Sequence, residues 1–279
     1  MKVEFFADGR VAQCTFDDLT NYDLDQKGYS STLGLQDVLL ASRYLGWFAH
    51  FVEKYALTSQ SLGIFVRAQR LVIHPSFYSR FSPKLPAMDT LRIVHVGRTS
   101  LVIRQDLQMK EAGDLIATAF TQAVLVNLNT RRSSPLPESY TRSFSDVMKL
   151  PRPVIFDDQP DFETQRRNRY DYKVVVAHED TDFYKHAQYD SYIKYCIDCA
   201  RFGARQRAYS AIQDDLSAYS ITEMSIQYLN ESVLNDELLV TSCEDKSNPH
   251  KIHFSIKKHG RQIVLCTISF GVTILLAKM

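Results

Sequence analysis

Hydrophobic and polar positions along the chain follow strand-like and helix-like patterns, and both halves show them in the same order. Short stretches rich in β-branched and aromatic residues predict strands, because such side chains fit a pleated, half-buried surface. In the first half a hairpin at 3–17 precedes a helical segment, and four strands follow it. Those strands are expected at 62–73, 90–96, 100–108 and 115–128. This order of elements predicts an α+β fold.

The helical segment of the first half, over 33–54, is apolar around most of its circumference. Candidate capping residues at 30–32 precede it, and it contains the bulky side chains of Trp47, Phe48 and Phe51. Because no broad polar face remains for water, this helix is expected to be deeply buried.

A second helix is predicted over 189–209. Apolar positions such as Tyr192 and Cys196 recur there at steps of three and four, which places them on one helix face. A strand at 170–177 and a charged turn at 178–188 precede this helix. Further strands are expected at 219–230, 236–243, 251–257 and 262–276.

Landmark residues recur between the halves at nearly constant separation, which indicates an internal repeat. The matched pairs are Asp23 with Asp180 and Asp25 with Asp182 (157), Arg43 with Arg201 (158), Asp89 with Asp236 (147) and Gly113 with Gly260 (147). The fall from 158 to 147 predicts an insertion of 11 residues in the loop at 74–89 of the first half.

A proline-rich segment separates the two halves. Residues 131–168 contain five of the nine prolines among serines and charges, which is typical of a linker that crosses a surface. A chain of 279 residues is long enough for two domains that each bury a core. We therefore expect domains at 1–130 and 169–279, joined by the linker at 131–168.

Composition and charge exclude several classes of partner. With 33 basic and 32 acidic residues, nothing indicates nucleic acid or an anionic membrane as the main partner. No apolar run approaches the roughly 18 residues of a membrane span, and the amino terminus lacks the apolar stretch of a secretory signal. A soluble cytoplasmic protein is expected. The terminal Ala277, Lys278 and Met279 are a relaxed form of a peroxisomal address, so the peroxisome is the alternative compartment.

The five cysteines are scattered and odd in number. Cys196 and Cys199 form a C-x-x-C pair, but they lie inside the predicted helix, which favours packing over redox chemistry. Structural disulfides are not expected. No second cysteine pair completes a zinc site, and no metal is expected.

The charged turn before the second helix holds the candidate chemistry. Asp180, Asp182 and His186 lie there, where free N–H groups and the positive end of the helix dipole can stabilise a developing oxyanion. This junction therefore suits acyl transfer. The alternative is structural, because acidic residues before a helix often act only as caps.

Both halves of the chain have the same order of elements: a strand, a charged turn, one long buried helix and four further strands. This order resembles the tandem hotdog fold of fatty-acyl thioesterases. The turn and helix at 179–201 are similar to those of the 4-hydroxybenzoyl-CoA thioesterase-like hotdogs. Plant and bacterial acyl-acyl-carrier-protein thioesterases carry D-x-D-x-N-x-H before this helix and Y-x-x-E-C on a following strand. Here these motifs read Asp180-Thr-Asp182-Phe-Tyr184-Lys-His186 and Tyr228-Leu-Asn-Glu231-Ser232. The resemblance covers nearly the whole chain and implies two hotdogs, each a long central helix wrapped by an antiparallel sheet.

The resemblance implies three catalytic residues. Asp182 would orient or polarise water or attack directly, His186 would transfer a proton, and Glu231 would act as general base or orient the histidine. The helix-start amides at 187–189 would form the oxyanion hole.

Residues around these three are expected to bind substrate. They are Asp180, Tyr184, Gln188, Tyr189 and Ser232. Two of them depart from the family, which has Asn where Tyr184 stands and Cys where Ser232 stands. The first half has no histidine after Asp25, so one working site is expected, in the second hotdog. The first hotdog would then supply the wall of the acyl pocket.

The function implied is hydrolysis of an acyl-CoA or acyl-carrier-protein thioester, without metal or organic cofactor. The departures at Tyr184 and Ser232 keep a second hypothesis open, in which a catalytically silent hotdog binds acyl chains or a protein partner. A hotdog hydratase is a third. A further dimer of the double hotdog is one expectation for its assembly.

Overall fold

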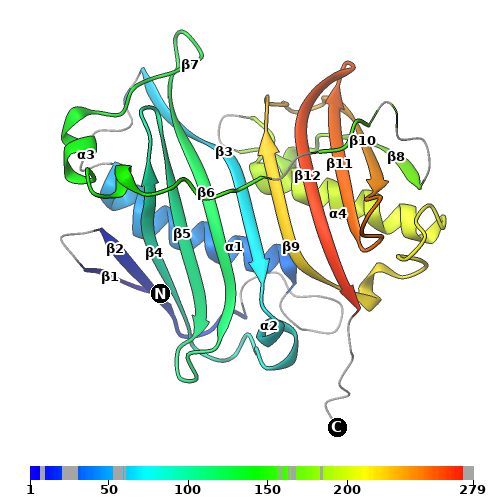
Figure 1. The fold of residues 1–279 in the computed structure, drawn as a ribbon, viewed down its shortest axis with the longest axis horizontal. Coiled ribbons are helices and arrows are strands. Elements are labelled where there is room, and N and C mark those ends of the chain that lie inside the picture. Colours follow the sequence, from blue (N-terminus) through cyan, green and yellow to red (C-terminus); the bar gives the residue numbers. More distant parts are fainter. Residues whose placement is uncertain are drawn as a thin grey trace. The chain divides into compact units, whose positions relative to one another are not determined.

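The computed structural model describes residues 1–6, 10–20, 31–52, 59, 61–156, 159–162, 164, 168–182 and 185–272. The chain divides into two compact units, unit 1 over Met1–Ile155 and unit 2 over Phe156–Met279. Each combines antiparallel strands with one long helix (Figure 1), so the α+β hotdog fold expected from the sequence is present. In the described part of the chain no helix is both long enough and apolar enough to cross a membrane.

Unit 1 contains an antiparallel sheet in the order β1-β2-β4-β5-β6-β3. Its strands are β1 (Lys2–Phe6), β2 (Val11–Phe16), β3 (Leu62–Ile73), β4 (Ala87–Val96), β5 (Ser100–Met109), β6 (Leu115–Asn127) and the short β7 (Arg132–Ser133). Its helical segments are α1 (Thr32–Arg43), the π-helix η2 (Tyr44–Val52), α2 (Pro75–Ser79), α3 (Glu138–Ser143) and η3 (Val147–Lys149). The initial hairpin and the four strands predicted after the helix are thereby confirmed.

Unit 2 also contains an antiparallel sheet, with its strands in the order β9-β12-β11-β10-β8. Its strands are β8 (Arg169–Val175), β9 (Tyr219–Tyr228), β10 (Glu237–Glu244), β11 (Lys251–Lys258) and β12 (Arg261–Val272). Its helices are α4 (Tyr189–Arg205) and the 3-10 turns η4 (His178–Asp180) and η5 (Leu216–Ala218). All five predicted strands are confirmed.

The first predicted helix differs from expectation in form and burial. It is α-helical only through Arg43 and continues as the π-helix η2. Tyr44 and Leu45 are 57% and 41% exposed, so the segment is not buried on all sides as its composition suggested. Ser31 caps its start, because its side chain accepts a hydrogen bond from the Gly34 amide at 2.9 Å.

The second helix ends four residues earlier than predicted. Its last helical residue is Arg205, and Arg207 has a positive φ of 54°. The Ala208 amide donates back to the Gly203 carbonyl at 2.9 Å, which closes the helix end. The apolar pattern continued to 209 because Tyr209 returns to the core, where it is 1% exposed.

The repeat landmarks agree with the structure only in part. Gly113 and Gly260 both have left-handed φ values, 70° and 76°, in the β5–β6 and β11–β12 hairpin turns. Asp89 and Asp236 differ, because Asp89 lies fully buried within β4 and Asp236 precedes β10. The two aspartates thus have different surroundings at this shared spacing.

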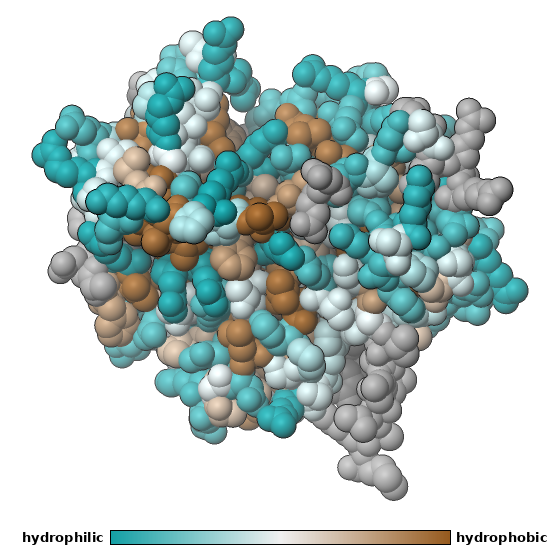
Figure 2. All heavy atoms as spheres, viewed as in Figure 1, coloured by the Kyte–Doolittle hydropathy of each residue, from teal (hydrophilic) through white to brown (hydrophobic). Residues whose placement is uncertain are grey.

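The proline-rich segment does more than cross a surface. Tyr140 lies in α3, and Phe144 directly follows the last residue of that helix. Both side chains are almost fully buried, and their ring centroids lie 4.8 Å apart. Farther on, Ile155 packs against Ala68 and Val102 of the unit 1 sheet. The same segment also exposes large apolar side chains, among them Met148, Leu150 and Val154. Figure 2 shows apolar side chains among polar ones on the face that it draws.

Candidate functional site

The charged turn of unit 2 begins with Asp180, which is only 5% exposed. Its Oδ1 accepts a hydrogen bond from Lys194 Nζ at 2.9 Å, and its Oδ2 accepts one from the Tyr195 hydroxyl at 2.8 Å. Burial alone raises the pKa of Asp180, but these hydrogen bonds outweigh it and hold the pKa below its usual range. Both carboxylate oxygens of Asp180 therefore accept hydrogen bonds from side chains of helix α4.

The backbone of Asp180 also fixes the start of this helix. Its carbonyl accepts the Gln188 amide at 2.8 Å and the Ser191 hydroxyl at 3.0 Å. The expected substrate-binding position of Asp180 is thus an interior one, where the side chain holds α4 in place.

Asp182 and His186 are joined in a closed turn. The Asp182 amide donates to the His186 carbonyl at 2.8 Å, and Asp182 Oδ1 accepts the His186 amide at 3.0 Å. Lys185 completes the turn with a positive φ of 63°. The segment with the D-x-x-x-H spacing is therefore closed by backbone hydrogen bonds. The side chains of Asp182 and His186 start from neighbouring positions on the backbone.

The structure brings His186 and Glu231 together, although 45 residues separate them. His186 Nδ1 lies 3.6 Å from Glu231 Oε2, an ion-pair distance somewhat longer than a hydrogen bond. The two side chains are 25% and 45% exposed, so solvent and a substrate can reach them. A backbone bridge between His186 and Val233 fixes this approach.

Ser232 is completely buried and lies beside Tyr192. Its Oγ is 2.8 Å from the Tyr192 hydroxyl, which also accepts the Ser232 amide at 3.0 Å. Burial raises the pKa of Tyr192, so the hydroxyl that contacts Ser232 stays protonated. Ser232, expected to bind substrate, thus lies in a buried hydrogen-bonded contact with α4.

The amides expected to form the oxyanion hole are partly occupied. The Ala187 amide donates to the Ser232 carbonyl at 2.9 Å, and the Gln188 amide donates to Asp180. The first bond adjoins the isolated antiparallel bridge between His186 and Val233, and the second adjoins the bridge between Thr181 and Ala187. Helix spacing does not reveal such bridges. Tyr189 is the first residue of α4, and the amides of a first helical turn point out of the N-terminal end of the helix.

The remaining predicted substrate-binding residues lie around the helix start. Gln188 occupies the N-cap position, and its side-chain amide is 3.4 Å from the Thr181 carbonyl. The Tyr189 carbonyl accepts the Tyr228 hydroxyl at 2.9 Å, and the two rings meet edge to face. Tyr184 lies outside the described residues.

Asp190 is a candidate that the sequence analysis did not single out. It lies in the first turn of α4, where an acidic residue is usually explained by the helix dipole. Burial raises its pKa, against the opposing effect of the Asp190 and Ser191 amides. Its Oδ1 has no hydrogen-bond partner among the described residues. A half-buried carboxyl with a raised pKa is a recognised signal of function.

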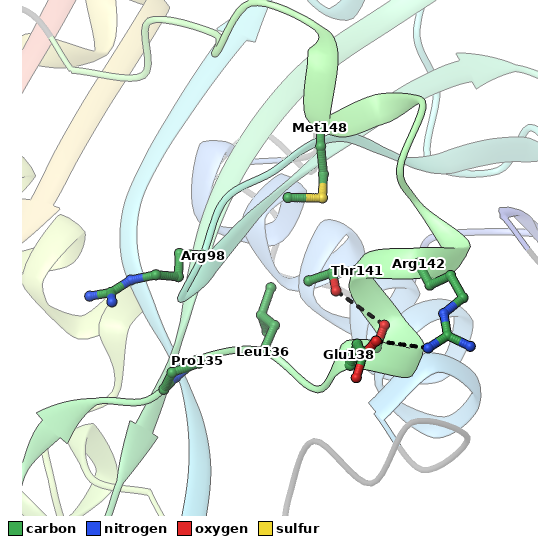
Figure 3. A pocket seen from close by; sticks show the side chains of 7 residues that line it. All are labelled: Arg98, Pro135, Leu136, Glu138, Thr141, Arg142 and Met148. Carbon is green, nitrogen blue, oxygen red and sulfur yellow. Dashed lines mark hydrogen bonds and ion pairs between the residues drawn. The ribbon is translucent and has the colours of Figure 1, made fainter.

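The surface hollows do not coincide with this turn. One of about 550 Å³ lies in unit 1, where Leu136 and Met148 point toward its centre and Arg98 and Arg142 stand at its edges (Figure 3). Another, of about 360 Å³, lies in unit 2 beside His253. Neither contains a predicted site residue, so the hydrogen-bonded turn, not a cavity, defines the candidate site. Asp23 and Asp25, its expected counterparts in unit 1, lie outside the described residues.

Comparison with known proteins supports the resemblance at the level of fold. The 12:0-ACP thioesterase from Umbellularia californica is 12% identical, with a TM-score of 0.72 over 96% of this chain and 99% of its own. An acyl-ACP thioesterase from Bacteroides thetaiotaomicron is 16% identical, with a TM-score of 0.70 over 95% and 99%. A putative oleoyl thioesterase from Lactobacillus plantarum is 15% identical, with a TM-score of 0.67 over 94% and 96%.

No protein-family model matches the sequence, and no curated protein matches it. The predicted likeness to acyl-carrier-protein thioesterases is therefore confirmed for the fold, through structure and not through sequence.

Proposed function

We propose that this chain is a thioester hydrolase that releases a fatty acid from acyl-CoA or from an acyl-carrier protein. The observation that carries the proposal is the pairing of His186 with Glu231 next to the closed Asp182–His186 turn. A carboxylate and an imidazole in this arrangement can activate water and return a proton. Solved thioesterases with the same fold over nearly the whole chain support it.

In the proposed reaction a water molecule attacks the thioester carbonyl carbon. Asp182 orients or polarises that water, and Glu231, or His186 oriented by Glu231, takes the proton that the water loses. The carbon–sulfur bond then breaks, and His186 supplies the proton that the thiolate takes up. In the alternative, Asp182 attacks the carbonyl carbon itself, the thiolate leaves, and water then hydrolyses the acyl-Asp182 anhydride to the fatty acid and the free carboxylate. The positive end of the α4 helix dipole would stabilise the oxyanion.

Among the described positions, Gln188 and Tyr189 are proposed to contact substrate, whereas Asp180 and Ser232 are proposed to hold the turn and helix in place. For Tyr184 the substrate contact is proposed from the family resemblance alone. The two units are proposed to be tandem hotdogs, with the chemistry in unit 2 and acyl binding in unit 1. A cytoplasmic location follows the sequence expectation.

The test measures thiol release from a panel of acyl-CoA and acyl-carrier-protein thioesters. Asp182→Asn keeps the shape of the side chain but removes its charge, and should lower turnover at least ~10²-fold with little change in thermal unfolding. Glu179→Gln is the matched control, because Glu179 is an exposed acid in the same turn. It should leave turnover unchanged.

The silent hotdog remains the second candidate, and the burial of Ser232 at the family's cysteine position favours it. Wild-type protein that binds acyl-CoA but releases no thiol above background would establish that reading. If Asp182→Asn lost about 0.3–1 kcal/mol of stability and its turnover did not change, Asp182 would act only as a negative charge that stabilises the start of the helix.

A further inference from the structure

Unit 1 contains a set of buried polar side chains between its sheet and α1. We refer to Arg43, Gln69, Asp89, Gln105 and Thr121 as the polar core. All five are at most 6% exposed. Directly paired residues of antiparallel strands point to the same side of a sheet, and Gln69 pairs with Thr121. Gln69 therefore faces the helix together with Thr121, which Arg43 of α1 contacts.

A continuous chain of hydrogen bonds connects four of these residues. Gln105 Nε2 donates to Asp89 Oδ2 at 2.7 Å and to the Leu39 carbonyl at 2.9 Å. Arg43 Nη1 donates to Gln105 Oε1 at 3.0 Å and to Thr121 Oγ1 at 2.7 Å. The chain thus runs from Asp89 to Thr121, and Gln69 lies beside its far end.

Both ends of this chain have unused hydrogen-bonding atoms. Neither Oε1 nor Nε2 of Gln69 has a partner among the described residues, and Asp89 Oδ1 has none either. On the same helix face, two turns before Arg43, Gln36 Oε1 also lacks a partner there. Leaving a buried polar group unpaired is costly, so such atoms indicate a polar guest.

The fold itself does not require polar residues here. In unit 2, Cys266 of β12 contacts Cys196 of α4, so its side of the sheet faces the helix. The buried residues of β9, β11 and β12 that point to the same side as Cys266 are apolar. Met224, Ile226, Phe254 and Ile268 are each at most 2% exposed there. Unit 2 therefore forms the same sheet and helix with apolar side chains at these positions, while β10 adds the buried polar residues Ser242 and Glu244 on that face. Three members of the polar core of unit 1 lie on β3, β5 and β6, which correspond in strand order to β9, β11 and β12, so they need another explanation.

The backbone next to the polar core is also irregular. Immediately after Arg43 the helix changes to the nine-residue π-helix η2. Such segments are rare and occur frequently at functional sites. Trp47 of this segment is 5% exposed, and its Nε1 donor has no partner among the described residues. Polar side chains and irregular backbone thus meet on one side of the unit 1 helix.

We infer that the polar core of unit 1 binds the oxygen function of a hydroxylated acyl chain. A hydroxyl group offers one donor and accepts hydrogen bonds, which matches the unused carbonyl oxygen and NH₂ of the Gln69 amide. Apolar neighbours such as Leu71 and Ile103, both at most 1% exposed, suit the hydrocarbon on either side. This inference rests on the proposed function, whose substrate class it narrows.

The test compares binding of saturated fatty acids with that of their monohydroxy derivatives, the hydroxyl placed in turn along the chain. Isothermal titration with the full-length protein should show one hydroxy acid binding at least ~10-fold more tightly than its parent. Met224 is the counterpart of Gln69 in unit 2, because Gln69 pairs with Thr121, Met224 pairs with Ile268, and Thr121 and Ile268 are 147 residues apart like Gly113 and Gly260. Gln69→Met therefore introduces the residue type of unit 2 and should abolish that difference. Gln108→Met is the matched control on the same sheet, and should preserve it.

Thermal unfolding accompanies each variant. Gln69→Met should not lower the melting temperature, because it replaces an unpaired buried amide by an apolar side chain of similar length. Equal binding of hydroxylated and parent acids, or a preference that survives in Gln69→Met, would overturn the inference and leave ordered water as the guest.

The outcome is separable from that of the proposed function, because titration with free acids needs no hydrolysis. Tight binding of a hydroxy acid without thiol release from any thioester would support this inference and contradict the hydrolase. Hydrolysis of thioesters with no preference for hydroxylated chains would do the reverse.

Discussion

Single carboxyl groups in this protein differ widely because of their surroundings. Asp180, 5% exposed, has a lowered pKa because Lys194 and Tyr195 donate hydrogen bonds to it. Asp89 is fully buried, and burial raises its pKa to about 6, against the opposing effects of Gln105, Ser42 and Arg43. Nothing in the local sequence distinguishes these two aspartates, because the difference arises from partners far along the chain.

Asp89 should make stability depend on pH. Since its pKa is raised in the folded state, its favourable contribution is complete below about pH 4 and is lost as the pH rises through about 6. A shift of about two units corresponds to about 3 kcal/mol at most. Asp89→Asn still accepts the Gln105 hydrogen bond but cannot ionise. Its free energy of unfolding should exceed that of the wild type by about 1–3 kcal/mol above this range.

Urea unfolding at about pH 4.5 and about pH 8 measures this difference. The advantage of Asp89→Asn should shrink toward the lower pH. Asp17→Asn, at an exposed site in unit 1, serves as the control and should leave the pH dependence of the wild type intact. Parallel pH curves for Asp89→Asn and wild type would contradict the assignment.

At the scale of elements, helix α4 depends on a close approach that a helical pattern cannot show. Gly203 lies where an added Cβ would be 2.6 Å from Cζ of Tyr209. Tyr209 is 1% exposed, and its hydroxyl is 2.7 Å from Ser242 Oγ. The ring is thus held against the helix backbone, and only glycine leaves room for it.

Gly203→Ala should therefore destabilise the protein by about 1–3 kcal/mol, as overpacking does. At an unobstructed helix position the same change would stabilise by about 0.8–1 kcal/mol. Chemical unfolding of Gly203→Ala, Tyr209→Leu and the double variant measures the coupling. In the Tyr209→Leu background the penalty of Gly203→Ala should fall. An unchanged penalty would show that the ring is not the obstacle.

The elements were largely predictable, because alternation and helical spacing are local properties of the sequence. The strands β3 to β6 and β9 to β12 lie within a few residues of their expected positions. The π-helix η2 and the end of α4 at Arg205 were not predictable. They depend on what packs against each segment, as Tyr209 does against Gly203.

For the whole molecule, the cysteines provide a test of packing across both units. All five are buried, free thiols. Burial raises the pKa of Cys14, Cys199 and Cys243 to about 12 each, and it also raises the pKa of Cys196. The packing role predicted for the Cys196–Cys199 pair agrees with this burial, since a thiolate would be disfavoured at either position.

A thiol reagent should therefore label fewer than about one cysteine per native chain within minutes, and all five after denaturation. Mass spectrometry of the labelled protein gives the count directly. Rapid labelling of Cys196 and Cys199 in the native state, or a disulfide between them after mild oxidation, would contradict the packing role.

The sequence by itself determined the α+β class, the order of strands and helices, and the turn that carries Asp182 and His186. These features depend on spacing along the chain, which is a local property. Tertiary structure alone decided which polar groups lose water. It buried Asp180 and Ser232, paired His186 with Glu231, and placed the Ala187 and Gln188 amides in hydrogen bonds within the turn. The physical reason is that desolvation and hydrogen bonding depend on neighbours brought together by sheet register and helix packing.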